Sequence, residues 1–156
     1  MQTRVFSPAV IAHAIDAPID FGDLVDVGIH KPARYMGHEL GVEPRDWTAS
    51  QVRWALTYPE IYEVGSSNLG HIILYSILNA VPGQLCDRAY LPGPDLAARL
   101  RQRRQPLFAV ESRRPLPAFD ILGFSLSYEL GATNILEMLD LCRLPIRAED
   151  LSLIHI

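Results

Sequence analysis

Two stretches rich in glycine and small polar residues are the candidates for chemistry in this sequence. They run from Tyr58 to Gly70 and from Ser125 to Asn134. The candidate cofactor-binding residues are Tyr58, Ser66, Ser67, Asn68, Gly70, Ser125, Ser127 and Glu129. Each stretch leads into a predicted helix, whose free backbone N–H groups favour anions. The pattern indicates a cradle for a phosphate-bearing or amide-rich cofactor, with ordinary capping and turn formation as the alternative; it contains neither a GxGxxG fingerprint nor a P-loop.

The other titratable residues on these loops form no recognised catalytic set. His71 is a lone histidine just inside a predicted helix, and a satisfied or solvent-facing side chain is favoured over a ligand role. Three acidic residues could pair as acid and base, but no spacing selects two of them, so surface roles are favoured; they are Glu60, Glu63 and Glu129. We therefore predict no catalytic residue and no metal ligand within this chain.

Alternating strands and helices position these loops. Strands are predicted over 52–58, 85–91 and 120–127, and helices over 68–80, 95–104 and 132–142. The strands are continuous apolar runs, which is typical of a parallel sheet covered on both faces. The sequence predicts an α/β fold: an incomplete doubly wound (Rossmann-like) parallel sheet with three strands present, preceded by an irregular leader over 1–50. The partial domain spans 51–150.

Hydrophobic spacing predicts which face of each helix packs inward. Leu69, Ile72, Ile73, Ser76, Ile77 and Ala80 share one face of the first helix. Leu96, Leu100 and Ala97 share one face of the second helix. Ile135, Leu136 and Leu139 share one face of the third, with Cys142 as a further candidate for that face. Ser66 or Ser67 is expected to cap the first helix. The third strand is expected to be buried on both faces.

Composition excludes several protein classes. The chain has 156 residues, 49% of them hydrophobic and 21% charged, which is ordinary for one globular domain. The two cysteines, Cys86 and Cys142, give no disulfide framework and match no metal-binding spacing. No apolar run is long enough for a membrane span, and no signal peptide is evident, so we expect a cytoplasmic protein that does not contact a membrane.

Charge gives little support for nucleic-acid binding. The net charge is −4, so there is no general basic footprint. Arg99, Arg101, Arg103 and Arg104 form a local basic cluster. A solvated helix face is favoured for this cluster, with RNA contact as the weaker alternative.

The last six residues resemble a sequencing-adapter scar. Leu-Ser-Leu-Ile-His-Ile, residues 151–156, is the translation of a transposase end sequence used to build sequencing libraries. Such scars are excluded from fold reasoning, although a short apolar C-terminal strand is the alternative interpretation. We therefore expect the natural chain to continue beyond Asp150.

Five ordered motifs within residues 30–150 resemble the N-terminal part of radical SAM proteins that carry a cobalamin-binding domain. The motifs are KPARYMGHEL (31–40), YPEIYEVGSSNLG (58–70), RAYLPGPD (88–95), PLFAVES (106–112) and FDILGFSLSYEL (119–130). The resemblance implies a cobalamin-binding type of doubly wound domain in front of a radical SAM barrel. It also places Ser125 and Ser127 near the nucleotide tail of the cofactor.

The resemblance implies chemistry that this chain does not itself carry. In such proteins a Cys-x3-Cys-x2-Cys motif holds a [4Fe–4S] cluster that cleaves S-adenosylmethionine to a radical. That motif is absent here, so cluster and S-adenosylmethionine are expected only in a downstream region, and the chain is expected to be truncated before it. Many cobalamin-binding domains also place an Asp-x-His-x-x-Gly motif after the first strand, and the loop from Tyr58 to Gly70 has no histidine.

Two functional hypotheses are favoured by the sequence, ahead of a third in which this is a different nucleotide-binding α/β protein. In the first, this is an N-terminal fragment of a radical SAM enzyme, without catalytic competence of its own, whose domain binds cobalamin or positions the radical SAM domain. In the second, it is a non-catalytic binding or interaction module that has lost cobalamin. The sequence leaves the substrate and the reaction type open.

Overall fold

The computed structural model describes residues 17–22, 24–37, 39, 42 and 45–147. The elements, in chain order, are η1 (Pro32–Tyr35), β1 (Val52–Tyr58), α2 (Tyr62–Gly65), α3 (Leu69–Ala80), β2 (Gln84–Tyr90), α4 (Pro94–Arg103), η2 (Leu116–Ala118), β3 (Ile121–Phe124) and α5 (Gly131–Cys142). The predicted sequencing-adapter scar at 151–156 lies outside the described residues.

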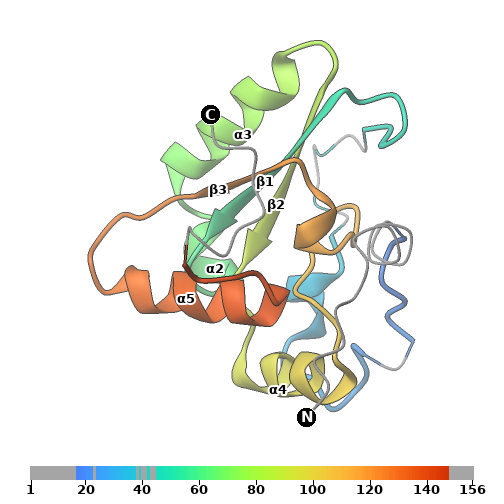
Figure 1. Ribbon diagram of the computed structural model, residues 1–156, viewed down its shortest axis with the longest axis vertical. Helices are drawn as coiled ribbons and strands as arrows, with labels where there is room; N and C mark the ends of the chain where they lie inside the picture. The colour runs from blue at the N-terminus through green and yellow to red at the C-terminus, as the bar shows by residue number, and fades with distance from the viewer. Residues whose placement is uncertain (1–16, 23, 38, 40–41, 43–44, 148–156) are drawn as a thin grey trace.

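The three strands form one parallel sheet in the order β2-β1-β3 (Figure 1). Trp54 of β1 pairs with Cys86 of β2 on one side and with Ile121 of β3 on the other. Because the strands are parallel, their carboxyl ends lie at one edge of the sheet, where the two polar loops leave it. The predicted open α/β sheet is therefore confirmed.

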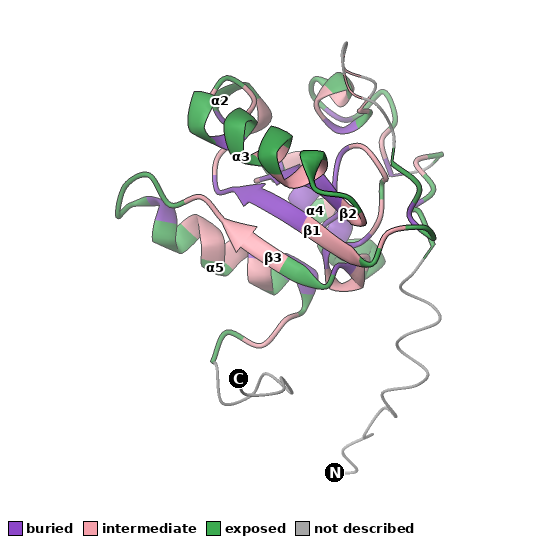
Figure 2. Ribbon diagram, turned by 90° about the horizontal axis from the view of Figure 1, so that it is seen from above, coloured by how far each residue is buried: buried purple, intermediate pink, exposed green. Residues whose placement is uncertain are grey.

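Helices cover both faces of the sheet. Helix α3 lies over β2 and β1 on one face, while α4 and α5 pack together on the other (Figure 2). The main core is formed on the α4–α5 side, where Ala55 and Ala89 meet Leu96, Leu100 and Met138. The predicted inward residues of α4, which are Leu96, Ala97 and Leu100, are all buried.

The third strand differs from its prediction. β3 spans only four residues, and none of them is fully buried. It pairs with β1 along one edge, and its outer edge has no paired strand among the described residues. The apolar composition of 120–127 is typical of a central strand, but among the described residues β3 lies at an edge of the sheet. It borders a cavity of about 540 Å³ that is lined partly by Leu122, Phe124 and Ile146.

Helix α3 is oriented opposite to its prediction. Leu69, Ile72, Ile73 and Ile77 were expected to face the core, yet all four are exposed. The side of α3 that meets the sheet carries His71, which is the only residue of the helix that is fully buried. The predicted cap is also wrong, because the Asn68 side chain accepts the hydrogen bond from the His71 backbone N–H. Ser67 instead donates to the carbonyls of Glu63 and Val64.

Helix α5 is rotated relative to its prediction. Cys142 is buried, as expected, but the other buried side chains are Met138 and Leu141, whereas Leu136 is exposed and Leu139 only partly buried. The helix packs against α4, and the residues that it contributes to the core cluster, Met138, Leu141 and Cys142, lie in its last two turns.

Part of the predicted leader packs onto the α/β domain. Ile19, Leu24, Ile29, Tyr35 and Trp47 belong to the same core cluster as the sheet and α4. The Tyr35 hydroxyl accepts a hydrogen bond from the backbone N–H of Gly93 at 2.9 Å, at the start of α4. The described residues from 17 to 50 thus help to build this core. Within the part of the chain that the structure describes, no helix combines the length and the apolar composition needed to cross a membrane.

Candidate functional site

The carboxyl edge of the sheet gathers four of the eight predicted site residues. The Tyr58 hydroxyl lies 3.1 Å from the Ser127 hydroxyl oxygen and accepts a hydrogen bond from the Asn68 amide at 3.2 Å. Ser125 joins them through His71, whose Nδ1 lies 3.4 Å from the Ser125 hydroxyl oxygen. The loops after β1 and β3 therefore do converge, as the parallel arrangement predicts.

The other four predicted residues lie apart from this group. Ser66 and Ser67 form the turn that ends α2. Gly70 is exposed in the first turn of α3, and Glu129 is exposed just before α5. They make no contact with the Tyr58 hydroxyl that the structure records.

Aromatic rings fill the space beneath this polar group. Tyr58, His71 and Tyr90 are each at most 4% exposed, and the His71 ring centroid lies 5.5 Å from that of Tyr58 and 5.7 Å from that of Tyr90. Helix α2 closes the space from above, because a Cβ on Gly65 would lie 2.5 Å from two atoms of the Tyr90 ring. The crevice between β1, β2 and α3 is thus packed with side chains.

His71 is held neutral in this packed space. Burial, together with the positive charge of Arg88, lowers the pKa of His71 to about 4. Its Nε2 atom and the Tyr90 hydroxyl are both buried, and neither has a hydrogen-bond partner among the described residues. The sequence favoured a satisfied or solvent-facing histidine, whereas the side chain is buried with one nitrogen unpaired.

A buried ionic cluster under α3 was not predicted from the sequence. Arg88 is 5% exposed; its Nη2 donates to Glu39 at 2.8 Å and its Nε to Glu111 at 2.9 Å. The guanidinium also lies over the Tyr75 ring, and the Tyr75 hydroxyl donates to Glu111. Burial and the nearby Asp87 charge raise the pKa of Glu111 to about 7. The cluster links the N-terminal segment, β2, α3 and the loop after α4.

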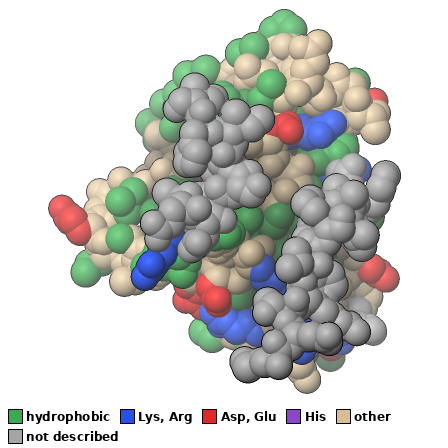
Figure 3. Space-filling view, in the orientation of Figure 1, with side chains coloured by type: hydrophobic (Ala, Val, Ile, Leu, Met, Phe, Trp, Pro, Cys, Tyr) green, Lys and Arg blue, Asp and Glu red, His purple; other side chains and the backbone are tan. Residues whose placement is uncertain are grey.

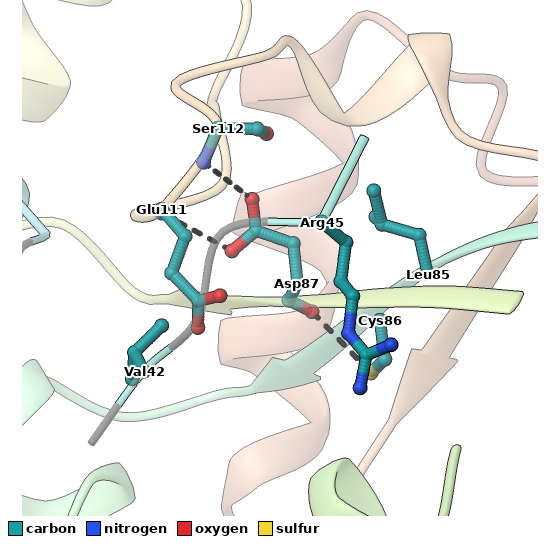
Figure 4. Close-up of a pocket in the computed structure, with 7 residues that line it drawn as sticks. All are labelled: Val42, Arg45, Leu85, Cys86, Asp87, Glu111 and Ser112. Carbon is teal, nitrogen blue, oxygen red and sulfur yellow. Dashed lines mark hydrogen bonds between the residues drawn. The ribbon is translucent and has the colours of Figure 1, made fainter. Parts of the chain in front are cut away.

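Asp87 fixes the segment that runs along the outer edge of β2. Its carboxylate accepts hydrogen bonds from the backbone N–H groups of Glu111 and Ser112 (Figure 4) and from that of Arg88. The Val110 N–H also donates to the Arg88 carbonyl, so this edge is covered. Beside Asp87 is a cavity of about 120 Å³ that Arg45 and Cys86 also line. Burial raises the pKa of Asp87, and the three N–H donors lower it again in part.

The acidic and basic surface residues have other partners. Glu63 binds Arg34 and Lys31, which lowers the pKa of Glu63 to about 2. Glu60 accepts a hydrogen bond from Tyr128. No two of the three loop glutamates pair. On α4, Arg101 contacts Glu137 and Asp140 of α5, so part of the basic cluster serves helix packing.

Neither cysteine is placed to hold a metal or a cluster. Cys86 and Cys142 are 2% and 4% exposed, and burial raises the pKa of each thiol to about 12. Metal and cluster ligation needs the thiolate, which both sites disfavour. Among the described residues there is no group of three or more His, Cys, Asp or Glu side chains suited to a metal ion.

The packed crevice does not fit the cobalamin that the family resemblance implies. A nucleotide tail that entered between β1, β2 and α3 would meet the rings of Tyr58, His71 and Tyr90. His71 is also too deeply buried, at 1% exposure, to reach a cobalt ion above the sheet edge. The residues present accommodate the tail only if these rings and the α2 segment move away.

The comparisons with known proteins support the radical SAM part of the resemblance. A family model described as radical SAM proteins, N-terminal, matches residues 70–152. No curated protein and no solved structure matches the chain. The matched region begins in the first turn of α3 and includes β2, the buried Arg88, β3 and α5. It covers more than half of the sequence, and the chain therefore belongs to the family of radical SAM proteins, as a part of their N-terminal region.

Proposed function

We propose that this chain supplies a non-catalytic α/β module that positions the catalytic domain of a radical SAM enzyme and does not bind cobalamin. The observation that carries the proposal is the crevice filled by Tyr58, His71 and Tyr90. Ligands of open α/β sheets bind at the carboxyl ends of the strands. Here the space between β1, β2 and α3 at those ends is part of the packed interior.

The buried contacts support a rigid positioning role. Arg88 and Asp87 join four segments that are distant in the sequence, with every carboxylate bonded. Satisfied polar networks of this kind hold a single arrangement of the elements around them. The two buried thiols add support, because the cluster that cleaves S-adenosylmethionine needs accessible thiolates and would belong to the catalytic domain.

Cobalamin binding stays a prediction as the second candidate function. The gathered hydroxyl and amide groups of Tyr58, Asn68, Ser125 and Ser127 favour it, since they could bond a polar cofactor at the sheet edge. It would require the crevice to open, and the chemistry of the cofactor when bound would be methyl or radical transfer.

Metal analysis of the full-length protein that contains this region separates the two functions. After anaerobic purification from cells supplied with hydroxocobalamin, we expect iron and sulfide in the amounts of at least one [4Fe–4S] cluster and no cobalt. Cobalt that co-purifies in proportion to the protein would favour the cofactor-binding function. A lack of iron and sulfide after cluster reconstitution would contradict the radical SAM part of the proposal.

A further inference from the structure

The outward side of α3 exposes large apolar side chains to solvent. The α3 outer surface comprises Leu69, Ile72, Ile73, Leu74, Ile77 and Val81, which are between 36% and 69% exposed. The helix contains no Asp, Glu, Lys or Arg residue. Figure 3 shows the molecule from the opposite side of the sheet, where Lys, Arg, Asp and Glu side chains gather in the lower half of the view. Surface helices normally place charged residues on their outward side.

Polar contacts fix this orientation of α3. The Asn79 side chain accepts from the Cys86 N–H and donates to the Cys86 carbonyl, both at 2.9 Å. One turn earlier, the Tyr75 hydroxyl donates to Glu111 at 2.9 Å. Rotation of the helix to bury its apolar residues would break these bonds and expose the aromatic packing of His71. The α3 outer surface is therefore a fixed feature of the fold.

The size of the surface indicates what kind of partner covers it. Its exposed apolar area is roughly 500 Å², at the upper end for a monomer and large enough to indicate an interaction site. A stable complex of separate proteins buries about 800 Å² on each partner, so the α3 outer surface alone is small for a lasting dimer. A domain tethered in the same polypeptide needs less area, because the tether raises its effective concentration.

We propose that the α3 outer surface is the docking surface for the catalytic domain of the same radical SAM polypeptide, which meets it with an apolar helix face. This inference rests on the proposed function and names the surface through which the module positions the catalytic domain. The absence of charge on α3 fits an apolar partner better than a nucleic acid, whose phosphates require cations.

Site-specific photocrosslinking in the full-length protein tests the docking surface. Benzoylphenylalanine is introduced at Ile73, at the centre of the α3 outer surface. A matched control carries it at Gln102, which is exposed on α4 on the opposite face of the sheet. We expect position 73 to crosslink, within one polypeptide, to peptides of the catalytic domain, and position 102 to give at most a tenth of that yield.

Other crosslinking outcomes overturn the proposal. A crosslinked dimer from position 73 would assign the surface to a second copy, and no crosslink, or equal yields at both positions, would show that the catalytic domain does not cover it. These outcomes are distinct from a failure of the proposed function, which appears as missing iron and sulfide in the same preparation.

A charge substitution gives an independent readout of the same surface. Ile73→Glu is expected to leave the melting temperature of the 156-residue chain unchanged, because the side chain is 47% exposed there. In the full-length protein we expect about tenfold faster tryptic cleavage between the domains, since a buried charge would weaken docking. The same cleavage rate as for Gln102→Glu would contradict the inference.

Discussion

Arg88→Met is expected to lower the free energy of unfolding by about 3–5 kcal/mol. Arg88 is buried and bonds Glu39 and Glu111, while the Asp87 carboxylate lies on the adjacent residue. Methionine fills a similar volume but leaves these carboxylates without a positive partner. Urea denaturation followed by circular dichroism measures the change.

The Arg88 effect should depend on pH. Glu111 has its pKa raised to about 7, so its contribution to stability is greatest below its ordinary pKa of 4.5 and is lost as the pH rises through 7. Without Arg88 the ionised carboxylate is still less favourable. We therefore expect the Arg88→Met difference to be larger at pH 8 than at pH 6.

Arg101→Met is the matched control for Arg88→Met. The same chemical change removes two ion pairs, to Glu137 and Asp140, whose members are all substantially exposed. Exposed pairs contribute little, so we expect a loss of no more than about 1 kcal/mol. Equal losses for the two variants would contradict the structural role of the buried Arg88 cluster.

Tyr90→Ala is expected to cost about 3–5 kcal/mol, the range found when a large buried aromatic residue is truncated. The Tyr90 ring contacts the rings of His71 and Tyr62 and supports the Gly65 backbone. Its removal would open a cavity in the crevice. Thermal and urea denaturation measure the loss, with Tyr128→Ala, an exposed aromatic residue, as the control within about 0.5 kcal/mol of wild type.

Removing only the hydroxyl of Tyr90 should not lower the free energy of unfolding. The hydroxyl is buried and has no hydrogen-bond partner within the part of the chain that the structure describes. Tyr90→Phe therefore removes an uncompensated polar group and is expected to be neutral or stabilising. Tyr58→Phe is expected to destabilise by about 1 kcal/mol, since its hydroxyl contacts Asn68 and Ser127. A clear loss of stability in Tyr90→Phe would show that the crevice holds a partner for this hydroxyl.

The sequence predicted the order and type of the elements because these depend on local patterns. Strand β1 begins and ends at the predicted residues, since Val52 to Tyr58 is a continuous β-prone run stopped by Pro59. The buried side of α4 was also correct, because Leu96 and Leu100 stand out against the charged residues of that helix. The spacing of these two leucines is compatible with only one apolar side of α4.

The orientation of α3 could not be predicted in this way. Apolar spacing shows that Leu69, Ile73 and Ile77 share a face, but it does not show what covers that face. The orientation is set by Glu111, which is 36 residues from its partner Tyr75, and by the Asn79 contacts with β2. Such non-local polar contacts have no signature in a single sequence.

The sequence predicted which loops converge at the candidate site, but it did not predict the aromatic side chains that fill the crevice. Convergence of Tyr58 with Ser125 and Ser127 follows from the parallel topology and was anticipated. The filling of the crevice depends on Tyr90, which sequence reasoning placed only in a strand. The alternation of Cys86, Arg88 and Tyr90 along β2 could have indicated that these side chains share the face covered by α3.

The most direct test of the central claim is a titration of the full-length protein that contains this region with hydroxocobalamin, followed by visible absorbance. A packed crevice predicts no saturable spectral change up to about 1 mM ligand, a range in which any binding stronger than about 4 kcal/mol is detected. It also predicts no increase in melting temperature at the highest ligand concentration. A saturable change in the cobalamin bands, accompanied by thermal stabilisation, would contradict the account and assign the sheet edge to the cofactor.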